Sequence, residues 1–456
     1  MGRPTPVTSA THSTPNGSVT TRKSGQVSDV HDNKSGMDVH NNLNGSRRSV
    51  TTRADGSRVV AERGRPGYAE HSYHFNGHDY ARRDYAWGGR IYPRFYRGYY
   101  VNGVYLDVYA PVYFYSPAFY GWVYNPWIGG PVPYAWGWAG AGWYGYYGYY
   151  FAPYPYYATP SDWLTDYVIS QDLQFAYAQQ QADQAAGVAA QPAGQPLLTP
   201  EIKAQIAAEV KAQIQLENGE AQKNAQGQDI DPALASVNRI FLDGKPHVFV
   251  ASGPLDVVDA SGNECALSDG DVLSLVNPPA PGDTNSTAAT LSVLVSKGGK
   301  ECAASVNVTV AIADLQEMQN SMRDAVDRGM QDLRASQGSG GLPAAPASTL
   351  SPAATSAIAQ GAPPAEPDVA GDVQRQIAAA DQVAAQAGPT GSADTQMLGQ
   401  APAAATINVG VGQSVADVTA ALGQPVAIID RGAAGKIYKY KDMKVTFKAG
   451  KVVDVE

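Results

Sequence analysis

The chain has 456 residues, a formal net charge of −9 and two cysteines. This length suits about two to four domains, but long intervals rich in Ala, Gly, Pro, Gln and Ser leave only small globular parts. A P-loop, a dinucleotide fingerprint, an HExxH, a GxSxG and a CxxC motif are all absent from the sequence, which argues against the enzyme classes that these motifs mark.

The charge is unevenly distributed along the chain. Residues 1–107 hold 15 Lys and Arg against 9 Asp and Glu, a net of +6, so the rest holds 18 against 33, a net of −15. An Arg-rich segment with interleaved aromatic residues could meet anionic polysaccharide, lipid headgroups or nucleic acid. The simpler interpretation is the solvated face of a polar sheet. We favour the simpler one and expect no nucleic-acid partner.

Turn signals recur through the first hundred residues, mostly 8 to 12 residues apart. They include Asn16-Gly17, Asn44-Gly45, Asp55-Gly56 and Asn102-Gly103. Asn-Gly and Asp-Gly supply the positive φ angles of hairpin turns, and the intervening runs are β-prone. They predict a β-meander over residues 16–107, after a disordered start over 1–15. Its early strands have few large apolar residues, so they can bury little by themselves.

The next segment is the most unusual one. Residues 108–161 contain no Asp, Glu, Lys, Arg or His, and 35 of these 54 residues are Tyr, Pro, Gly or Trp. Within residues 134–152, five glycines and nine Tyr or Trp argue against a membrane helix, because Tyr and Trp prefer the membrane interface. We expect residues 108–160 to form a self-packed, turn-rich segment with no transmembrane span.

Helical and β patterns alternate in the remaining chain. Apolar residues at helical spacing predict amphipathic helices over 161–180, 199–217 and 313–335, with a linker over 181–198. Short β-prone runs separated by Gly turns, beginning with RIFLDG, predict a small β-barrel or sandwich over 237–312. The Ala/Pro-rich composition of residues 336–405 predicts a disordered linker with one weak helix near 373–387.

The pattern of residues in the last segment, 406–456, predicts a small α+β module. Ser414 and Asp417 are placed for a capped helix, and three strands follow, the last bending at Ala449-Gly450. The complete fold class that we expect is therefore a multidomain α+β protein. It comprises a β-meander, an aromatic turn-rich segment, amphipathic helices, a small β-barrel or sandwich and a terminal α+β module, joined by disordered linkers.

The two cysteines indicate a compartment. Cys265 and Cys302 fall in the same predicted β-domain, and in an oxidising environment such a pair forms a disulfide. Two unpaired core thiols are the alternative. The opening MGRPTPVTSATHSTPNG has no apolar signal-peptide core. We expect an extracytoplasmic location, in the periplasm, the outer envelope or the medium, with a signal peptide not visible in this chain.

Catalytic and metal-binding chemistry is hard to place on this sequence. Six of the seven histidines precede residue 79, and only His247 lies near the predicted β-domain. His71, His74 and His78 are close in sequence, but strand alternation and a turn would separate them. The acidic cluster between residues 256 and 271 fits no standard calcium loop, so turn chemistry is the alternative. We expect no catalytic residue, no cofactor and no metal.

Two resemblances accompany these patterns. The C-terminal residues GQSVADV from Gly412, LGQP from Leu422, YKY from Tyr438 and VTFKAGKV from Val445 resemble the small lipoprotein module of outer-membrane assembly factor E. That resemblance implies a binding or scaffold module. The Tyr/Trp/Gly-rich middle is similar to exported bacterial proteins with a YxWGxW repeat, whose first four positions match residues 134–137.

The leading hypothesis is a non-enzymatic structural or interaction protein of the bacterial cell envelope, or a secreted one. The alternative is a protein that binds glycan or cell wall through exposed aromatic rings and arginines, and an enzyme of unknown type comes third. The expected partner is cell-wall glycan or another envelope protein, and the sequence leaves the oligomeric state open. The binding surface of the alternative comprises Trp122, Trp127, Trp136, Trp138, Trp143, Arg82, Arg83 and Arg90.

Overall fold

The computed structural model describes residues 9–185, 198–297 and 301–387, together with Val418 and four short strands beyond residue 426. The chain divides into two compact units, Met1–Gly391 and Ser392–Glu456, and each is described by itself. Helices and strands contribute in similar proportion, so the predicted mixed α and β class is confirmed.

The first unit is built on a ten-stranded antiparallel sheet whose strands follow chain order. They are β1 (Ala10–Thr14), β2 (Gly17–Thr21), β3 (Val27–Asp32), β4 (Met37–Asn41), β5 (Arg47–Thr52), β6 (Arg58–Glu62), β7 (Gly67–Phe75), β8 (His78–Trp87), β9 (Arg90–Val101) and β10 (Val104–Ala110). Asn102 and Gly103 have φ of 49° and 78°, the positive angles that a type I′ hairpin turn needs. The sheet covers the predicted meander, and β1 occupies part of the start that was expected to be disordered.

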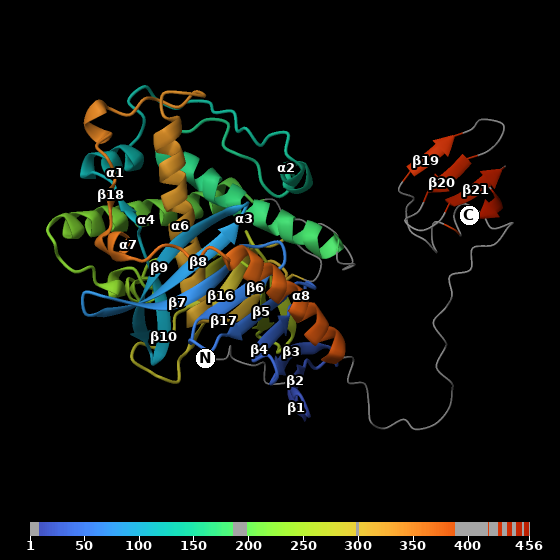
Figure 1. The fold of residues 1–456 in the computed structure, drawn as a ribbon. Helices are drawn as coiled ribbons and strands as arrows, with labels where there is room; N and C mark the ends of the chain where they lie inside the picture. The colour runs from blue at the N-terminus through green and yellow to red at the C-terminus, as the bar shows by residue number, and fades with distance from the viewer. Residues whose placement is uncertain are drawn as a thin grey trace. The chain divides into compact units, whose positions relative to one another are not determined.

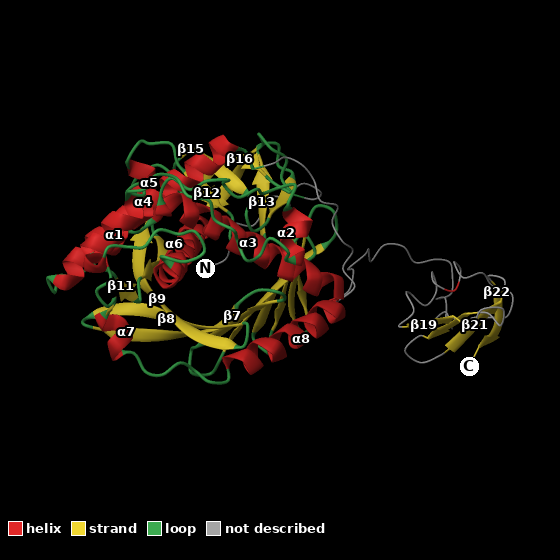
Figure 2. Cartoon of the chain, turned by 90° about the horizontal axis from the view of Figure 1, so that it is seen from above, coloured by secondary structure: helices red, strands yellow, loops and turns green. Residues whose placement is uncertain are grey.

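Both faces of the meander are covered. Helix α8 (Val369–Ala387) runs along one face, and the helices α3 (Pro160–Ala185) and α6 (Ile312–Ser336) lie on the other (Figures 1 and 2). Val373 of α8 packs with Val59 and Ala69 of the sheet, and Ala380 packs with Val39. A Cβ at Gly67 would lie 2.4 Å from Val373, so the small residue permits this close approach.

The expectation of a disordered linker over 336–405 is wrong for its described part. Residues 337–387 contain the 3-10 turn η2 (Ala347–Thr349), β18 (Ala354–Thr355), α7 (Ala357–Gly361) and α8, while 388–405 lie outside the described residues. The physical reason is mutual burial: the early strands lack large side chains, and an Ala-rich helix with a narrow apolar face fits closely against them.

The aromatic segment folds on itself and on the helices around it. It contributes β11 (Tyr113–Phe114), α1 (Pro117–Tyr124) and α2 (Gly142–Tyr147), which share one core with α3, α4 (Pro200–Ala225) and α6. The Trp136 ring stacks between Trp138 and Trp163, with centroids 5.1 and 4.9 Å apart. These rings bury apolar area that a chain poor in aliphatic residues lacks.

One ion pair anchors this uncharged segment. Lys203 of α4 lies 2.7 Å from Asp166 of α3, and its ammonium group also donates to the Ala152 carbonyl. The Tyr157 hydroxyl donates to Asp166 at 2.8 Å, and the ammonium lies 3.6 Å from the centre of the Tyr154 ring. Burial raises the pKa of Asp166 and lowers that of Lys203. The segment thus supplies the polar groups that two buried charges require.

The second sheet of this unit has six antiparallel strands in the order β12-β15-β16-β17-β13-β14. The strands are β12 (Val248–Val250), β13 (Leu255–Asp259), β14 (Glu264–Leu267), β15 (Val272–Asn277), β16 (Ala288–Val295) and β17 (Asn307–Ala311). The predicted disulfide is present: Cys265 and Cys302 are bonded, with Cα atoms 5.0 Å apart.

The predicted first strand of this domain, RIFLDG, is instead mostly helical. The 3-10 turn η1 (Pro232–Leu234) leads into α5 (Val237–Leu242), which packs on α6. Val237, Ile240 and Phe241 are all buried, and their spacing of three and four residues places them on one helical face. The helical period extends upstream of the predicted strand, so the β-prone residues alone were misleading.

The second unit contains one four-stranded antiparallel sheet in chain order. Its strands are β19 (Ala427–Asp430), β20 (Lys436–Lys439), β21 (Lys444–Lys448) and β22 (Lys451–Val455). The last predicted strand is a hairpin, because Lys448 pairs with Lys451. The predicted capped helix falls outside the described residues, apart from Val418, which is helical and buried.

Replacing Val373 with Asp tests whether α8 is an integral part of the first unit. A buried carboxylate without a partner should lower the free energy of unfolding by about 2–4 kcal/mol. It should also speed amide hydrogen exchange along residues 369–387. The control Gln374→Asp changes an exposed neighbour and should stay within about 0.5 kcal/mol of the parent. Equal unfolding curves for the two variants would contradict the packing described here.

Candidate functional site

The arginines of the meander pair with acids from later in the chain. Among the described residues, eight of them contact carboxylates outside the meander. The pairs are Arg22 with Asp256, Arg47 and Arg63 with Asp381, Arg53 with Glu366, Arg65 with Asp269, Arg83 with Glu317, Arg94 with Asp324, and Arg97 with Asp229. The excess positive charge of residues 1–107 is therefore largely neutralised within the molecule, and neither an anionic partner nor a solvated face is needed to explain it.

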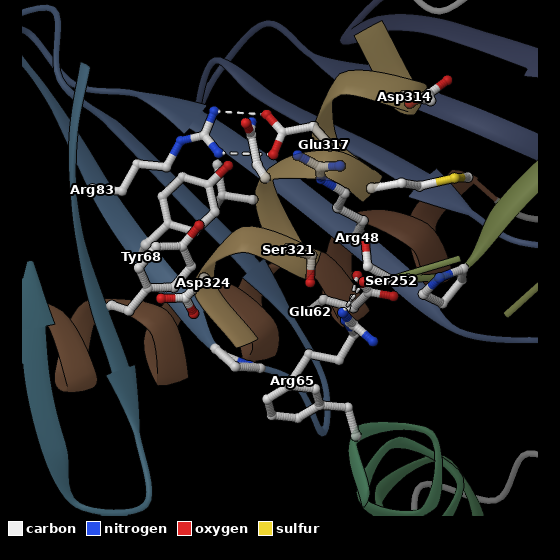
Figure 3. Close-up of a pocket in the computed structure, with 18 of the residues that line it drawn as sticks. Arg48, Glu62, Arg65, Tyr68, Arg83, Ser252, Asp314, Glu317, Ser321 and Asp324 are labelled. Carbon is white, nitrogen blue, oxygen red and sulfur yellow. Dashed lines mark hydrogen bonds and ion pairs between the residues drawn. The ribbon is translucent and has the colours of Figure 1, made fainter. Parts of the chain in front are cut away.

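A cavity of about 200 Å³ lies between the meander, α6, the side of α3 at Phe175 and the loop 252–255. Figure 3 shows its charged side chains converging from the sheet and from α6. Four arginines and four acids line it: Arg48, Arg65, Arg83, Arg328, Glu62, Asp314, Glu317 and Asp324. Its wall thus carries no net formal charge.

Tyrosines form the sheet side of the cavity. Tyr68, Tyr85 and Tyr92 stand opposite one another on β7, β8 and β9, so their rings form one row. The centroids of Tyr68 and Tyr85 are 4.8 Å apart, and those of Tyr85 and Tyr92 are 5.7 Å apart. Burial raises the pKa of each of these phenols, so all three stay neutral at physiological pH. The row brings aromatic rings and hydroxyl groups to the cavity wall, and the guanidinium groups of Arg83 and Arg94 lie over the Tyr68 and Tyr92 rings, 5.1 and 4.8 Å from their centres.

Arg83 is the most heavily paired group in the wall. Its guanidinium donates to Glu317 through two nitrogens, at 3.0 and 2.9 Å, and to Glu70 at 2.9 Å and Asp107 at 3.1 Å. It also lies 4.1 Å from the centre of the Tyr96 ring. Four of its five N–H donors are used in these hydrogen bonds, so Arg83 mainly shapes the cavity.

The remaining paired charges close the cavity at its other sides. Arg94 pairs with Asp324, and Arg328 lies 3.2 Å from the same carboxylate. Burial would raise the pKa of Asp324, but Arg94 and Arg328 lower it below its usual value. Arg65 pairs with Asp269 and donates to the Ser252 carbonyl. Asp324 is therefore held as a carboxylate by its two arginines.

Arg48 differs from the other arginines of the wall. No hydrogen bond, and no ion pair within 4 Å, joins it to any of the described residues. Its neighbour across the strands is Glu62, and its side chain points from β5 toward Glu317 on α6 (Figure 3). Burial lowers the pKa of Arg48, but Tyr68, Glu62 and Glu317 outweigh this and raise it. The cavity therefore contains one firmly charged guanidinium with donors to spare.

The surface expected for glycan binding does not form as the sequence suggested. Trp127 and Trp143 are buried, at 5% and 6% exposure, and Arg82 and Arg83 are buried at 4% each. Trp122, Trp136 and Trp138 are half-buried against the aromatic core. Only Arg90 is exposed. The rings point inward because they pack on one another and on α3, so this part of the hypothesis is corrected.

Each histidine considered for chemistry is bound to its own separate partner. His247 lies between Glu209 and Asp243, with one ring nitrogen 2.9 Å from each carboxylate. His71 contacts Glu366, His74 contacts Asp79, and His78 contacts Arg97. They do not converge on one point.

The acids of the 256–271 cluster are similarly separated. Asp256 pairs with Arg22, Asp269 with Arg65 and Asp271 with Lys297. Asp259 accepts from the Ser261 and Asn263 amides, which is turn chemistry. Within the described ranges, no group of three His, Cys, Asp or Glu is placed to hold a metal ion.

Sequence reasoning missed the residues that line the cavity, apart from Arg83. One signal was present: Tyr68, Tyr85 and Tyr92 occupy facing positions once consecutive hairpins are folded about their turns. Arg48 carried no comparable signal, because its neighbours Glu317 and Asp314 come from a helix more than 250 residues later in the chain.

The chain matches no protein family model, no curated protein and no solved structure. None of the described helices is long and apolar enough to cross a membrane. The assignment of function therefore depends on the cavity and its surroundings.

The His247 contacts give a stability that depends on pH. Burial would lower the pKa of His247, but the hydrogen bonds that its ring donates to the Glu209 and Asp243 carboxylates raise it above its usual value. Its stabilising effect is therefore fully present below about pH 6.5 and is lost as pH rises through the raised pKa. We expect His247→Gln to be less stable than the parent by about 1–3 kcal/mol at pH 6, with a smaller difference at pH 9.

Urea unfolding at the two pH values measures this difference. His74→Gln, which changes an exposed histidine paired with Asp79 across the β7–β8 hairpin, is the matched control and should change little at either pH. If His247→Gln lowers the free energy of unfolding by the same amount at pH 6 and at pH 9, the imidazole acts by packing alone.

Proposed function

We propose that this chain is a non-enzymatic binding protein of an oxidising, extracytoplasmic compartment, whose ligand occupies the cavity between the meander and α6. The observation that carries the proposal is the uncommitted Arg48 in a wall whose other arginines are all paired. Arg48 is half-buried, and a ligand acceptor placed in the cavity gains a hydrogen bond to its charged guanidinium.

The chemistry of the wall supports binding over catalysis. None of the seven histidines lines this cavity. General acid-base catalysis needs a group whose pKa lies near the working pH. Here the pKa of Asp324 is lowered, and Glu317 is held by two hydrogen bonds from Arg83. Asp324 therefore serves as an acceptor across the physiological pH range.

The disulfide supports the compartment, since such bonds persist where thiols are not kept reduced. A cell-envelope location and a partner in the envelope, such as cell-wall glycan or another envelope protein, belong to the same proposal. The resemblances of the aromatic segment and the terminal module agree with it.

Thiol trapping in cells tests the compartment. Cys265 and Cys302 should resist alkylation until a reductant is added, in the periplasmic or secreted fraction of cells that express the full reading frame. Cys265→Ser with Cys302→Ser should lower the free energy of unfolding by about 3–4 kcal/mol, because 37 residues separate the two cysteines. Free thiols on protein from freshly lysed, trapped cells would contradict the assignment.

A cavity-filling variant tests the binding site. Amino acids, small organic acids, polyamines and simple sugars are each added to the purified full chain, and the melting temperature is recorded. At least one class should raise it, because a ligand stabilises the state that binds it. Ser321→Phe, which places a ring in the cavity wall, should abolish the shift, and Ser339→Phe at an exposed site should not. No shift with any class would refute the proposal.

A further inference from the structure

The charges around the cavity restrict the kind of ligand that it can hold. This inference rests on the proposed function and concerns the chemical class of the ligand. The wall contains equal numbers of arginines and acids. An anion beside Arg48 would also face Glu317 and Asp314, and a cation beside Glu317 would face Arg48 and Arg83. Because each charge would meet repulsion from half of the wall, the cavity favours a neutral ligand.

The hydrogen-bonding groups call for both donors and acceptors on that ligand. Arg48 offers guanidinium N–H donors, which need an acceptor. Glu62 is an acceptor on the neighbouring strand, and the Ser321 hydroxyl both donates and accepts. Hydroxyl groups on the ligand can accept from Arg48, donate to Glu62 and do either with Ser321, since each hydroxyl donates once and accepts twice. A neutral molecule with several hydroxyls therefore satisfies this wall where a hydrocarbon cannot.

The tyrosine row adds aromatic carbon surface to this polar wall. Tyr68, Tyr85 and Tyr92 hold their rings in one row on the sheet, and Phe175 of α3 also lines the cavity. The rings are fixed by their mutual contacts, so packing a ligand on them costs little side-chain entropy. A sugar ring has the matching shape: C–H groups on its faces and hydroxyls around its edge.

The size of the cavity sets the length of the ligand. Pockets for drug-sized molecules occupy about 300–1,000 Å³, and this cavity has about 200 Å³. It suits a single sugar ring. We propose that the cavity binds one neutral sugar unit, with Arg48 donating to its hydroxyls and the tyrosine row packing against its ring. The unit is a free monosaccharide or the end of a glycan chain, since both present the same ring.

Isothermal titration of the full chain tests this assignment. The neutral probes are glucose, galactose, mannose and N-acetylglucosamine, and the charged counterparts are glucuronate and glucosamine. At least one neutral sugar should bind, and at least tenfold more tightly than its charged counterparts. Arg48→Met should weaken that binding at least tenfold. Arg90→Met, which changes an exposed arginine with no contact to the cavity, should leave it unchanged.

The melting temperature of each variant without ligand reports whether it folds. Should Arg48→Met fail to fold, Arg48→Gln and Tyr92→Leu probe the polar and aromatic sides separately, and each should weaken sugar binding. A disaccharide that binds as tightly as its terminal sugar identifies a glycan end, whereas loss of binding identifies a free sugar.

Two results would overturn the inference, and they differ in meaning. If glucuronate, glucosamine, an amino acid or an organic acid binds and the neutral sugars do not, the sugar assignment fails while the binding function stands. If no compound binds, the sugar assignment and the proposed binding function both fail.

Discussion

The structure depends on the pairing of arginines on one sheet with carboxylates from distant parts of the chain. Arg83, Arg94 and Arg65 each reach an acid on another element. Arg83 and Asp269 are buried, whereas Glu317 is exposed and the other partners are half-buried. Removing Arg65 would leave the buried Asp269 carboxylate without its partner, which costs about 3–5 kcal/mol. The pairs therefore specify where α6 and the second sheet lie against the meander, and they explain why a basic segment and an acidic remainder coexist in one molecule.

The same pairing creates the cavity. Ion pairs need their side chains extended between layers, so the sheet and α6 do not close on each other as two apolar faces would. The space that remains is lined by the paired charges, a row of tyrosines and Arg48, which has no hydrogen bond or ion pair with any residue that the structure describes. The binding function proposed above rests on this combination of acceptors, an unpaired donor group and aromatic rings.

Aromatic packing performs a different task at the other end of the first unit. The uncharged segment builds its core from rings stacked on rings, and it uses backbone and phenol groups to hold the single Lys203–Asp166 pair. Its tryptophans therefore serve mainly to stabilise this core. The residues predicted from the sequence to bind glycan do not line the cavity between the meander and α6. Arg83 is the one member of that predicted set that does.

Many of the helices, strands and turns of this protein could be predicted from its sequence, because they depend on residues close together in the chain. Hairpin turns at Asn-Gly and Asp-Gly, helical spacing along α4 and α6, and two cysteines in one β-rich segment depend on near neighbours, and the structure has a meander, helices and a disulfide at those places. The neighbours that α6 brings to Arg48, the distant partner of Arg83 and the strands on which α8 packs could not be predicted from the sequence. They depend on contacts between residues more than 200 positions apart, and many pairings of arginine and acid are equally compatible with the composition. Only the tertiary structure selects among them, because the packing of helices and of the second sheet against the meander decides which charges meet.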